Sequence, residues 1–242
     1  MAASGDVILA GAEEFTLRKA ILVYAGSDRQ AACATVHEVG IGTDGRTTIL
    51  AGVAATVQSV AEIATLLTRQ AKVGGFLPAN ILSVGIDSLL WWVPPAKRRV
   101  FFESEKLGGE RSAEVPHPGL VFRLDGENEW SVFAVKGQDR PTPDTSLFLA
   151  PYFNVWSDGK ICNGNVAVPP GSTAETVSSW EKAFFDSYFT HPNVHAPAKL
   201  VEHKGGAYGF WKAMLDGRYK RFPERVLVET GHRLSDLLDE SR

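Results

Sequence analysis

The segment Asn154–Cys162, with the sequence Asn-Val-Trp-Ser-Asp-Gly-Lys-Ile-Cys, decides the fold and chemistry expected of this chain. It follows the apolar run Ser146–Ala150, which is typical of a strand leaving the core. The central Ser-Asp-Gly is turn chemistry. The chain then returns to present Cys162, one of its two cysteines, with the Asn154 amide eight residues upstream. A thiol nucleophile beside an amide donor is what acyl transfer through a thioester requires.

The composition is that of an ordinary globular protein. The chain has 242 residues, of which 44% are hydrophobic and 22% charged. Its net charge of -3 gives no general attraction to nucleic acid or an anionic membrane. No apolar stretch is clean enough for a membrane helix, and the first residues lack the features of a secretory signal. Two distant cysteines make neither a disulfide framework nor a zinc site. We therefore expect a cytoplasmic protein with free thiols, no metal or other cofactor, and no nucleic-acid or membrane partner.

The N-terminal part alternates like strands, and a helix follows it. We expect a strand-rich extension over residues 1–56 and a main domain over residues 57–242. Cys33 falls in a strand-like run, where it is expected to be a small buried hydrophobe. The expected strands are Lys19–Tyr24, Ala31–Val39 and Arg46–Ala51, and the expected helix is Val57–Lys72.

Residues 80–153 favour an antiparallel meander. A break at Pro94-Pro95 separates its first two strands, and Asp125–Asn128 has the character of a hairpin turn. The charged, glycine-containing stretch Glu103–Pro118 is expected to be a loop. The opposite faces of a strand should separate Trp91 from Trp92. The expected strands are Leu89–Val93, Arg99–Phe102, Leu120–Leu124 and Trp130–Val135, with the run into Asn154 as the last.

Helices are expected again after residue 170. Ser172 and Glu175 have the spacing of a capping box, and Pro192 should stop the helix that they begin. One face of this helix is expected to hold Trp180, Ala183, Phe184, Ser187 and Tyr188. A further helix, Ala207–Leu215, should end at Gly217. The order of strands, helix, meander and helices predicts an α+β protein.

This order and these residues resemble the ubiquitin-conjugating enzyme fold. In that family a helix precedes a four-stranded meander, whose last strand leads into a His-Pro-Asn motif. The active cysteine lies eight residues past that Asn, in a turn of the type Ser-Asp-Gly-x-Ile-Cys. Asn154 matches the motif Asn, and Cys162 matches the nucleophile. Tyr152-Phe153 stands where the family has His-Pro, and Asn163–Asn165 replaces the usual Leu-Asp.

More narrowly, the chain is similar to the B-protein family of the PRTRC system, a divergent prokaryotic ubiquitin-conjugating-enzyme-like group. The likeness rests on Phe76–Gly85, with the sequence Phe-Leu-Pro-Ala-Asn-Ile-Leu-Ser-Val-Gly, on Leu90-Trp91-Trp92 and on the Cys162 segment. It implies a bacterial cytoplasm and three companions. These are an activating enzyme of the ThiF type, a small ubiquitin-like protein and a JAB-type metallopeptidase.

The resemblance implies a mechanism for the residues that match. Cys162 would accept the C-terminal acyl group of the ubiquitin-like protein, and Asn154 would donate to the oxyanion when an amine attacks the thioester. Tyr152, Asp158 and Gly159 are expected to support the active-site loop. Lys160 would favour the Cys162 thiolate electrostatically, whereas Asp158 would oppose it.

Two histidines follow the expected helix and can return an imidazole to a site that lacks the motif histidine. His191 and His195 are therefore candidate catalytic residues. The alternative is a pair of solvated loop histidines flanking a proline.

Other interpretations remain open. One is a catalytically silent scaffold of the same fold that binds a ubiquitin-like protein or its activating enzyme. Another is a cysteine hydrolase that uses Cys162 with His191 or His195. The basic clusters Lys97–Arg99 and Arg218–Arg221 are either solvated faces or docking sites for an acidic partner.

Overall fold

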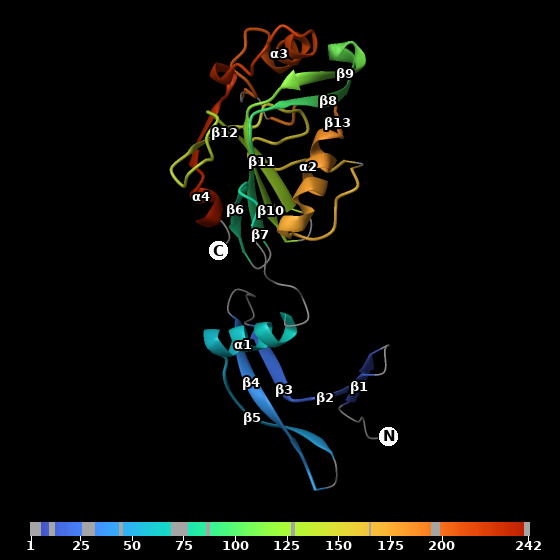
Figure 1. Ribbon diagram of the computed structural model, residues 1–242, viewed down its shortest axis with the longest axis vertical. Helices are drawn as coiled ribbons and strands as arrows, with labels where there is room; N and C mark the ends of the chain where they lie inside the picture. The colour runs from blue at the N-terminus through green and yellow to red at the C-terminus, as the bar shows by residue number, and fades with distance from the viewer. Residues whose placement is uncertain are drawn as a thin grey trace. The chain divides into compact units, whose positions relative to one another are not determined.

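The computed structural model describes residues 6–9, 13–25, 32–43, 46–68, 77–85, 88–126, 129–164, 166–194 and 199–239. The chain forms two compact units, Met1–Gly75 and Phe76–Arg242 (Figure 1). Helix α1 (Val57–Thr68) falls in the first unit by this division. The boundary expected after residue 56, between the extension and the main domain, stays a prediction.

The first unit is built from antiparallel strands followed by α1. Strand β4 lies at the centre of a three-stranded sheet, between β3 and β5. The three strands and the start of the helix are where the sequence predicts them. The prediction for Cys33 is wrong, because its side chain is exposed and the sheet leaves most of its residues open to solvent. The strands are β1 (Asp6–Leu9), β2 (Glu13–Thr16), β3 (Lys19–Ala25), β4 (Ala32–Ile41) and β5 (Thr47–Ala54).

The second unit contains a six-stranded antiparallel sheet. Its strand order is β14-β12-β11-β10-β7-β6. The sequence does not predict the outermost strand β14, which adds to β12 from the far end of the chain. The strands are β6 (Ile81–Val84), β7 (Ser88–Val93), β10 (Gly119–Asp125), β11 (Glu129–Val135), β12 (Ser146–Leu149) and β14 (Glu229–Arg233).

A long hairpin bends between two sheets at its prolines. Strand β7 continues into β8 (Lys97–Ser104), which turns through a short 3₁₀ helix, Glu105–Leu107, into β9 (Gly109–Pro116). The inner part pairs β7 with β10, and the outer part pairs β8 with β9. Prolines near residues 94–95 and 116–118 interrupt both arms at the same level, because proline cannot donate to the ladder.

The loop expected over Glu103–Pro118 is therefore wrong. Half of it is the strand β9, which pairs with β8 along its whole length, and the first residues of the stretch are the end of β8 and the 3₁₀ helix. Exposed residues alternate with partly buried ones along β9, since the outer half of the hairpin has one face in solvent. That alternation is the strand signal that the high charge obscured.

One helix covers a face of the main sheet, and another packs on the hairpin of β8 and β9. Helix α2 (Val177–Phe185) packs against β10 and β11 (Figure 1): the Trp180 ring lies 5.1 Å from Trp130, and Phe184 lies 5.1 Å from Phe122. Helix α3 (Gly206–Leu215) ends as predicted, at a Gly217 with φ of 72°. The other helical segments are the 3₁₀ helices Ala174–Thr176 and Glu224–Val226 and the short α4 (Asp236–Asp239).

Both predicted ends of α2 are wrong. The chain enters α2 through the 3₁₀ helix, and no side-chain hydrogen bond caps either helix, so Ser172 and Glu175 form no capping box. The helix stops at Phe185, well before Pro192. The next residues form β13 (Tyr188–Phe189) instead, which pairs in parallel with β8. This long-range pairing overrides the local helical pattern.

The core lies on both faces of the main sheet, and alternate strand residues supply its two parts. Trp91 is fully buried in the larger core beneath α2 and α3, whereas Trp92 packs on a smaller cluster around Leu234 and Leu237. The expected separation of the two tryptophans is confirmed. None of the described helices has the length and apolarity needed to cross a bilayer.

A buried hydrogen bond joins the end of β9 to the segment that leads into Asn154. The Tyr152 hydroxyl, with no exposed surface, donates to His117 Nδ1, and His117 Nε2 donates to the Arg98 carbonyl at 3.2 Å. A carbonyl only accepts, so the ring proton sits on Nε2 and Nδ1 is the acceptor. Burial lowers the pKa of His117 to about 4 and raises that of Tyr152. Both groups are therefore neutral at physiological pH.

We predict that the second unit loses stability as the pH falls from 6.5 to about 4. In this window the unfolded chain binds a proton at His117 that the folded chain does not. The free energy of unfolding should therefore drop by about 3 kcal/mol in total. Urea denaturation followed by tryptophan fluorescence measures it, because all six tryptophans lie in the second unit.

The control is His117→Gln, whose amide can make both hydrogen bonds but does not titrate. Its stability should vary less with pH over the same window. Equal slopes for the two proteins would contradict the assignment of the effect to His117.

Candidate functional site

Asn154 and Cys162 are neighbours because the segment between them is a short hairpin. The Cys162 N–H donates to the Asn154 carbonyl at 2.8 Å, and the Trp156 N–H donates to the Lys160 carbonyl at 2.9 Å. The Gly159 N–H closes the turn on the Trp156 carbonyl at 3.0 Å. The spacing of eight residues is thus the length of two paired arms and a turn.

The hairpin is fastened to β11 by its returning arm. The Ile161 N–H donates to the Trp130 carbonyl at 3.1 Å, and the Val132 N–H donates to the Gly159 carbonyl at 2.9 Å. At Gly159 φ is 84°, and a Cβ would collide with the Phe133 ring, so glycine is required there.

The turn residue Asp158 stabilises the same bend. Its Oδ1 accepts the Lys160 N–H at 3.0 Å, as in an Asx turn. Asp158 and Gly159 therefore lie where a loop-supporting role places them.

The Asn154 side chain ties the hairpin to the segment after α2. Its Nδ2 donates to the Tyr188 carbonyl at 2.8 Å. Its Oδ1 accepts two hydrogen bonds from Thr190, one from the N–H at 3.1 Å and one from the hydroxyl at 2.9 Å. Asn154 has φ of 62°, the one positive value at a non-glycine among the described residues. Asparagine tolerates this conformation better than most residues.

The hydrogen bonds of Thr190 fix the tautomer of His191. The Thr190 hydroxyl has one proton, and that proton goes to Asn154 Oδ1. The contact of 2.9 Å between Thr190 Oγ1 and His191 Nδ1 is then donated by the ring. The neutral imidazole accordingly carries its proton on Nδ1 and leaves Nε2 free as a base.

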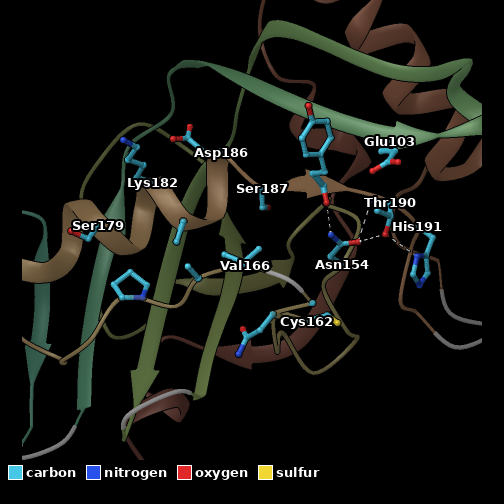
Figure 2. A pocket seen from close by; sticks show the side chains of 16 residues that line it. Glu103, Asn154, Cys162, Val166, Ser179, Lys182, Asp186, Ser187, Thr190 and His191 are labelled. Atoms are coloured by element: carbon cyan, nitrogen blue, oxygen red, sulfur yellow. Dashed lines mark hydrogen bonds between the residues drawn. The ribbon is translucent and has the colours of Figure 1, made fainter.

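These groups line an open groove of about 780 Å³ (Figure 2). Asn154 and Cys162 come from the hairpin. Lys182 comes from the end of α2, and His191 comes from the segment that follows it. The Cys162 side chain is exposed. Glu103, Lys182 and Asp186 supply the charges of the lining.

The residues beside Cys162 in the chain are held by hydrogen bonds and an ion pair of their own. Among the described residues, the thiol has no hydrogen-bonding partner, and Lys160 is ion-paired with Glu129 at 3.5 Å. Asn163 accepts a hydrogen bond from the buried Trp130 indole, which fixes the residue after the cysteine. The Lys160 charge is therefore partly neutralised by its own partner. Within the part of the chain that the structure describes, no three acidic, cysteine or histidine side chains gather to bind a metal.

The structure brings together Asn154, Cys162 and His191 of the predicted site. Tyr152 does not line the groove: it is buried, its hydroxyl is bonded to His117, and its ring packs on Phe189 beneath the site. His195 lies outside the described residues. The sequence analysis missed Thr190 and His117. No local signal marks either residue, because their partners are 36 and 35 residues away.

Comparison with known proteins identifies one family. The model of prokaryotic E2 family D matches residues 57–230, which is well over half of the chain. The match includes the whole hairpin, Thr190 and His191. No curated protein and no solved structure gives a significant match.

We predict that neutral His191 is protonated on Nδ1. Long-range ¹H–¹⁵N NMR spectra of the histidine rings at alkaline pH report the tautomer directly, and His191→Gln identifies the signal by its loss. Thr190→Val removes the acceptor and should move the proton population toward Nε2. An Nε2-protonated ring in the wild-type protein would contradict the hydrogen-bond order inferred above.

Proposed function

Because this chain belongs to prokaryotic E2 family D, a family of the ubiquitin-conjugating type, we propose that it carries the acyl group of a ubiquitin-like protein on Cys162. It then passes this group from the thioester to an amine. One observation carries the proposal: backbone pairing at 2.8 Å sets Cys162 beside Asn154, and both line a groove with His191. Acyl transfer uses a nucleophile, an oxyanion donor and a base.

The proposed fold is that of the ubiquitin-conjugating enzymes, with the bent hairpin and β10–β12 as its meander. The narrower place proposed is the PRTRC B-protein family, in the bacterial cytoplasm. Its proposed partners are an activating enzyme of the ThiF type, a small ubiquitin-like protein and a JAB-type metallopeptidase. The support for these is the similarity of Phe76–Gly85, Leu90–Trp92 and the Cys162 segment to that family.

In the first step Cys162 takes the acyl group from the activating enzyme. The Cys162 thiolate attacks the carbonyl of a thioester, a new S–C bond forms, and the thiolate of the activating enzyme leaves. The free energy of this exchange is close to zero, because one thioester replaces another. An exposed cysteine that no ion pair or hydrogen bond constrains is sufficient for it.

In the second step an amine attacks the thioester, and Asn154 stabilises the oxyanion. Three hydrogen bonds, to Tyr188 and Thr190, fix the Asn154 amide and leave its second N–H unassigned. That N–H is the proposed donor. A donor held in place before the reaction costs no reorganisation in the transition state, and removing one costs roughly 2.7–4 kcal/mol in other enzymes.

His191 is the proposed base for the same step. Its free Nε2 accepts the proton that the attacking nitrogen loses as the C–N bond forms, and the Cys162 thiolate departs. The Nδ1–H bond to Thr190 holds the ring in the tautomer that this task needs.

A silent scaffold for a ubiquitin-like protein or its activating enzyme is the second candidate. One observation favours it: Asn154 uses its oxygen and one N–H to hold residues 188–190, which is a structural task. A cysteine hydrolase gains no support, since among the described residues no histidine is hydrogen-bonded to the Cys162 thiol.

We predict that Cys162 becomes loaded in a reaction with the ThiF-type enzyme, the ubiquitin-like protein and ATP. A non-reducing gel should show an adduct that reductant removes. Cys162→Ala should abolish the adduct, and Cys162→Ser should give an ester that resists reductant. Cys33→Ala is the matched control, because Cys33 is the other exposed cysteine.

Failure of loading, with the activating enzyme shown to be charged, would favour the scaffold. Loss of the adduct in Cys33→Ala rather than Cys162→Ala would move the carrier to the first unit.

We predict that Asn154→Ala slows transfer to free lysine by about 10²–10³-fold while loading stays near the wild-type rate. The reason is that the oxyanion donor acts when the amine attacks, whereas loading only exchanges thioesters. Single-turnover decay of the purified thioester measures the second step. Asn163→Ala is the comparison, since it removes an amide on the other side of Cys162. Equal losses of both steps in Asn154→Ala would make Asn154 structural.

A further inference from the structure

The two basic clusters of the sequence meet at a second groove. Lys97, at the start of β8, lines an open groove of about 790 Å³ together with Lys220 and Arg221. These side chains are exposed. The groove shares no lining residue with the one that holds Cys162. It is therefore a separate feature of the second unit.

The bend in the long hairpin creates this groove. Pro95 and Ala96 on one arm, and Pro116 and Pro118 on the other, line it where both arms leave the main sheet. Proline has no N–H, so the wall offers no backbone hydrogen-bond donor at these positions. The shape of the groove therefore comes from the bend in the long hairpin.

The opposite side of the groove is held against the core. Tyr219 and Phe222 pack on the buried Phe210, with ring centroids 6.2 and 5.9 Å away. The residues between them, Lys220 and Arg221, consequently face solvent. Lys220 and Arg221 lie on a segment that packing holds in place. Little backbone conformational entropy is therefore lost when a ligand binds.

The charge of the groove is unbalanced. Within the described part of the chain, no carboxylate forms an ion pair with Lys97, Lys220 or Arg221. The one acidic residue of the lining, Glu224, accepts the Gly137 N–H at 2.9 Å. Three unpaired cations in a concave site raise the local concentration of an anionic ligand.

We propose that this groove binds an extended, acidic chain segment of a partner protein. Carboxylates would pair with Lys97, Lys220 and Arg221, of which arginine can bind a carboxylate in bidentate fashion. The proline-lined walls would contact the apolar parts of such a segment. A nucleic acid fits less well, because the chain has a net charge of -3 and Phe222 is engaged with the core instead of open for base stacking.

The test is fluorescence anisotropy with the full chain and a labelled peptide of about ten residues, roughly 33 Å long when extended. One peptide alternates Glu with Ala, and its partner carries Gln in place of every Glu. The acidic peptide should bind and the Gln peptide should not. Its affinity should fall as the salt concentration rises.

The variant Lys220→Glu/Arg221→Glu should weaken binding by about tenfold or more, since it turns attraction into repulsion. Lys204→Glu is the matched control, an exposed cation outside the groove, and should bind as the wild type does. Tryptophan fluorescence checks that each variant is folded. If the double variant unfolds, a variant with both Lys97→Gln and Lys220→Gln replaces it. Its affinity for the acidic peptide should be about threefold lower or more.

Three results would overturn the proposal. One is equal binding of the acidic and Gln peptides. Another is a loss of peptide affinity in Lys204→Glu as large as that in the double variant. The third is a single-stranded oligonucleotide of equal charge that binds more tightly than the peptide and is lost in the same variants.

Discussion

The candidate site depends on the way one side-chain amide joins two segments of the chain. Asn154 holds Tyr188 and Thr190 with its side chain, while its backbone accepts from Cys162 and donates to His191. These bonds connect the hairpin to the segment that follows α2, which the β-bridge between Trp156 and Asn193 also joins. The groove exists because its two sides are fastened to each other at this residue.

In the proposed ubiquitin-conjugating fold, Tyr152 stands where the motif has its histidine. Its side chain is directed into the core, where its hydroxyl meets His117. The Tyr152–His117 pair is neutral and protected from solvent, and under the proposed function it would brace the loop from the interior. His191, held by Thr190, leaves an imidazole at the groove itself.

The local part of this site could be predicted from the sequence, and the tertiary part could not. Ser-Asp-Gly and the spacing of Asn154 from Cys162 express turn chemistry, which acts over a few residues. Thr190 and His117 are defined by partners more than thirty residues away, and no periodicity encodes such contacts. The early end of α2 was missed for the same reason, whereas β9 has a local alternation that its charged residues obscured. The early end of α2 depends on the pairing of β13 with β8, which outweighs the local preference.

The hairpin also limits how such a sequence can diverge. An insertion or deletion between Asn154 and Cys162 would shift the pairing with β11 and turn the thiol to the opposite side. Residues before Asn154 are constrained differently, because Tyr152 and Phe153 are fully buried and are selected by the core, not by the groove. Distant relatives are therefore better sought by the fixed interval from Asn to Cys, followed downstream by Thr-His, than by a His-Pro-Asn triplet.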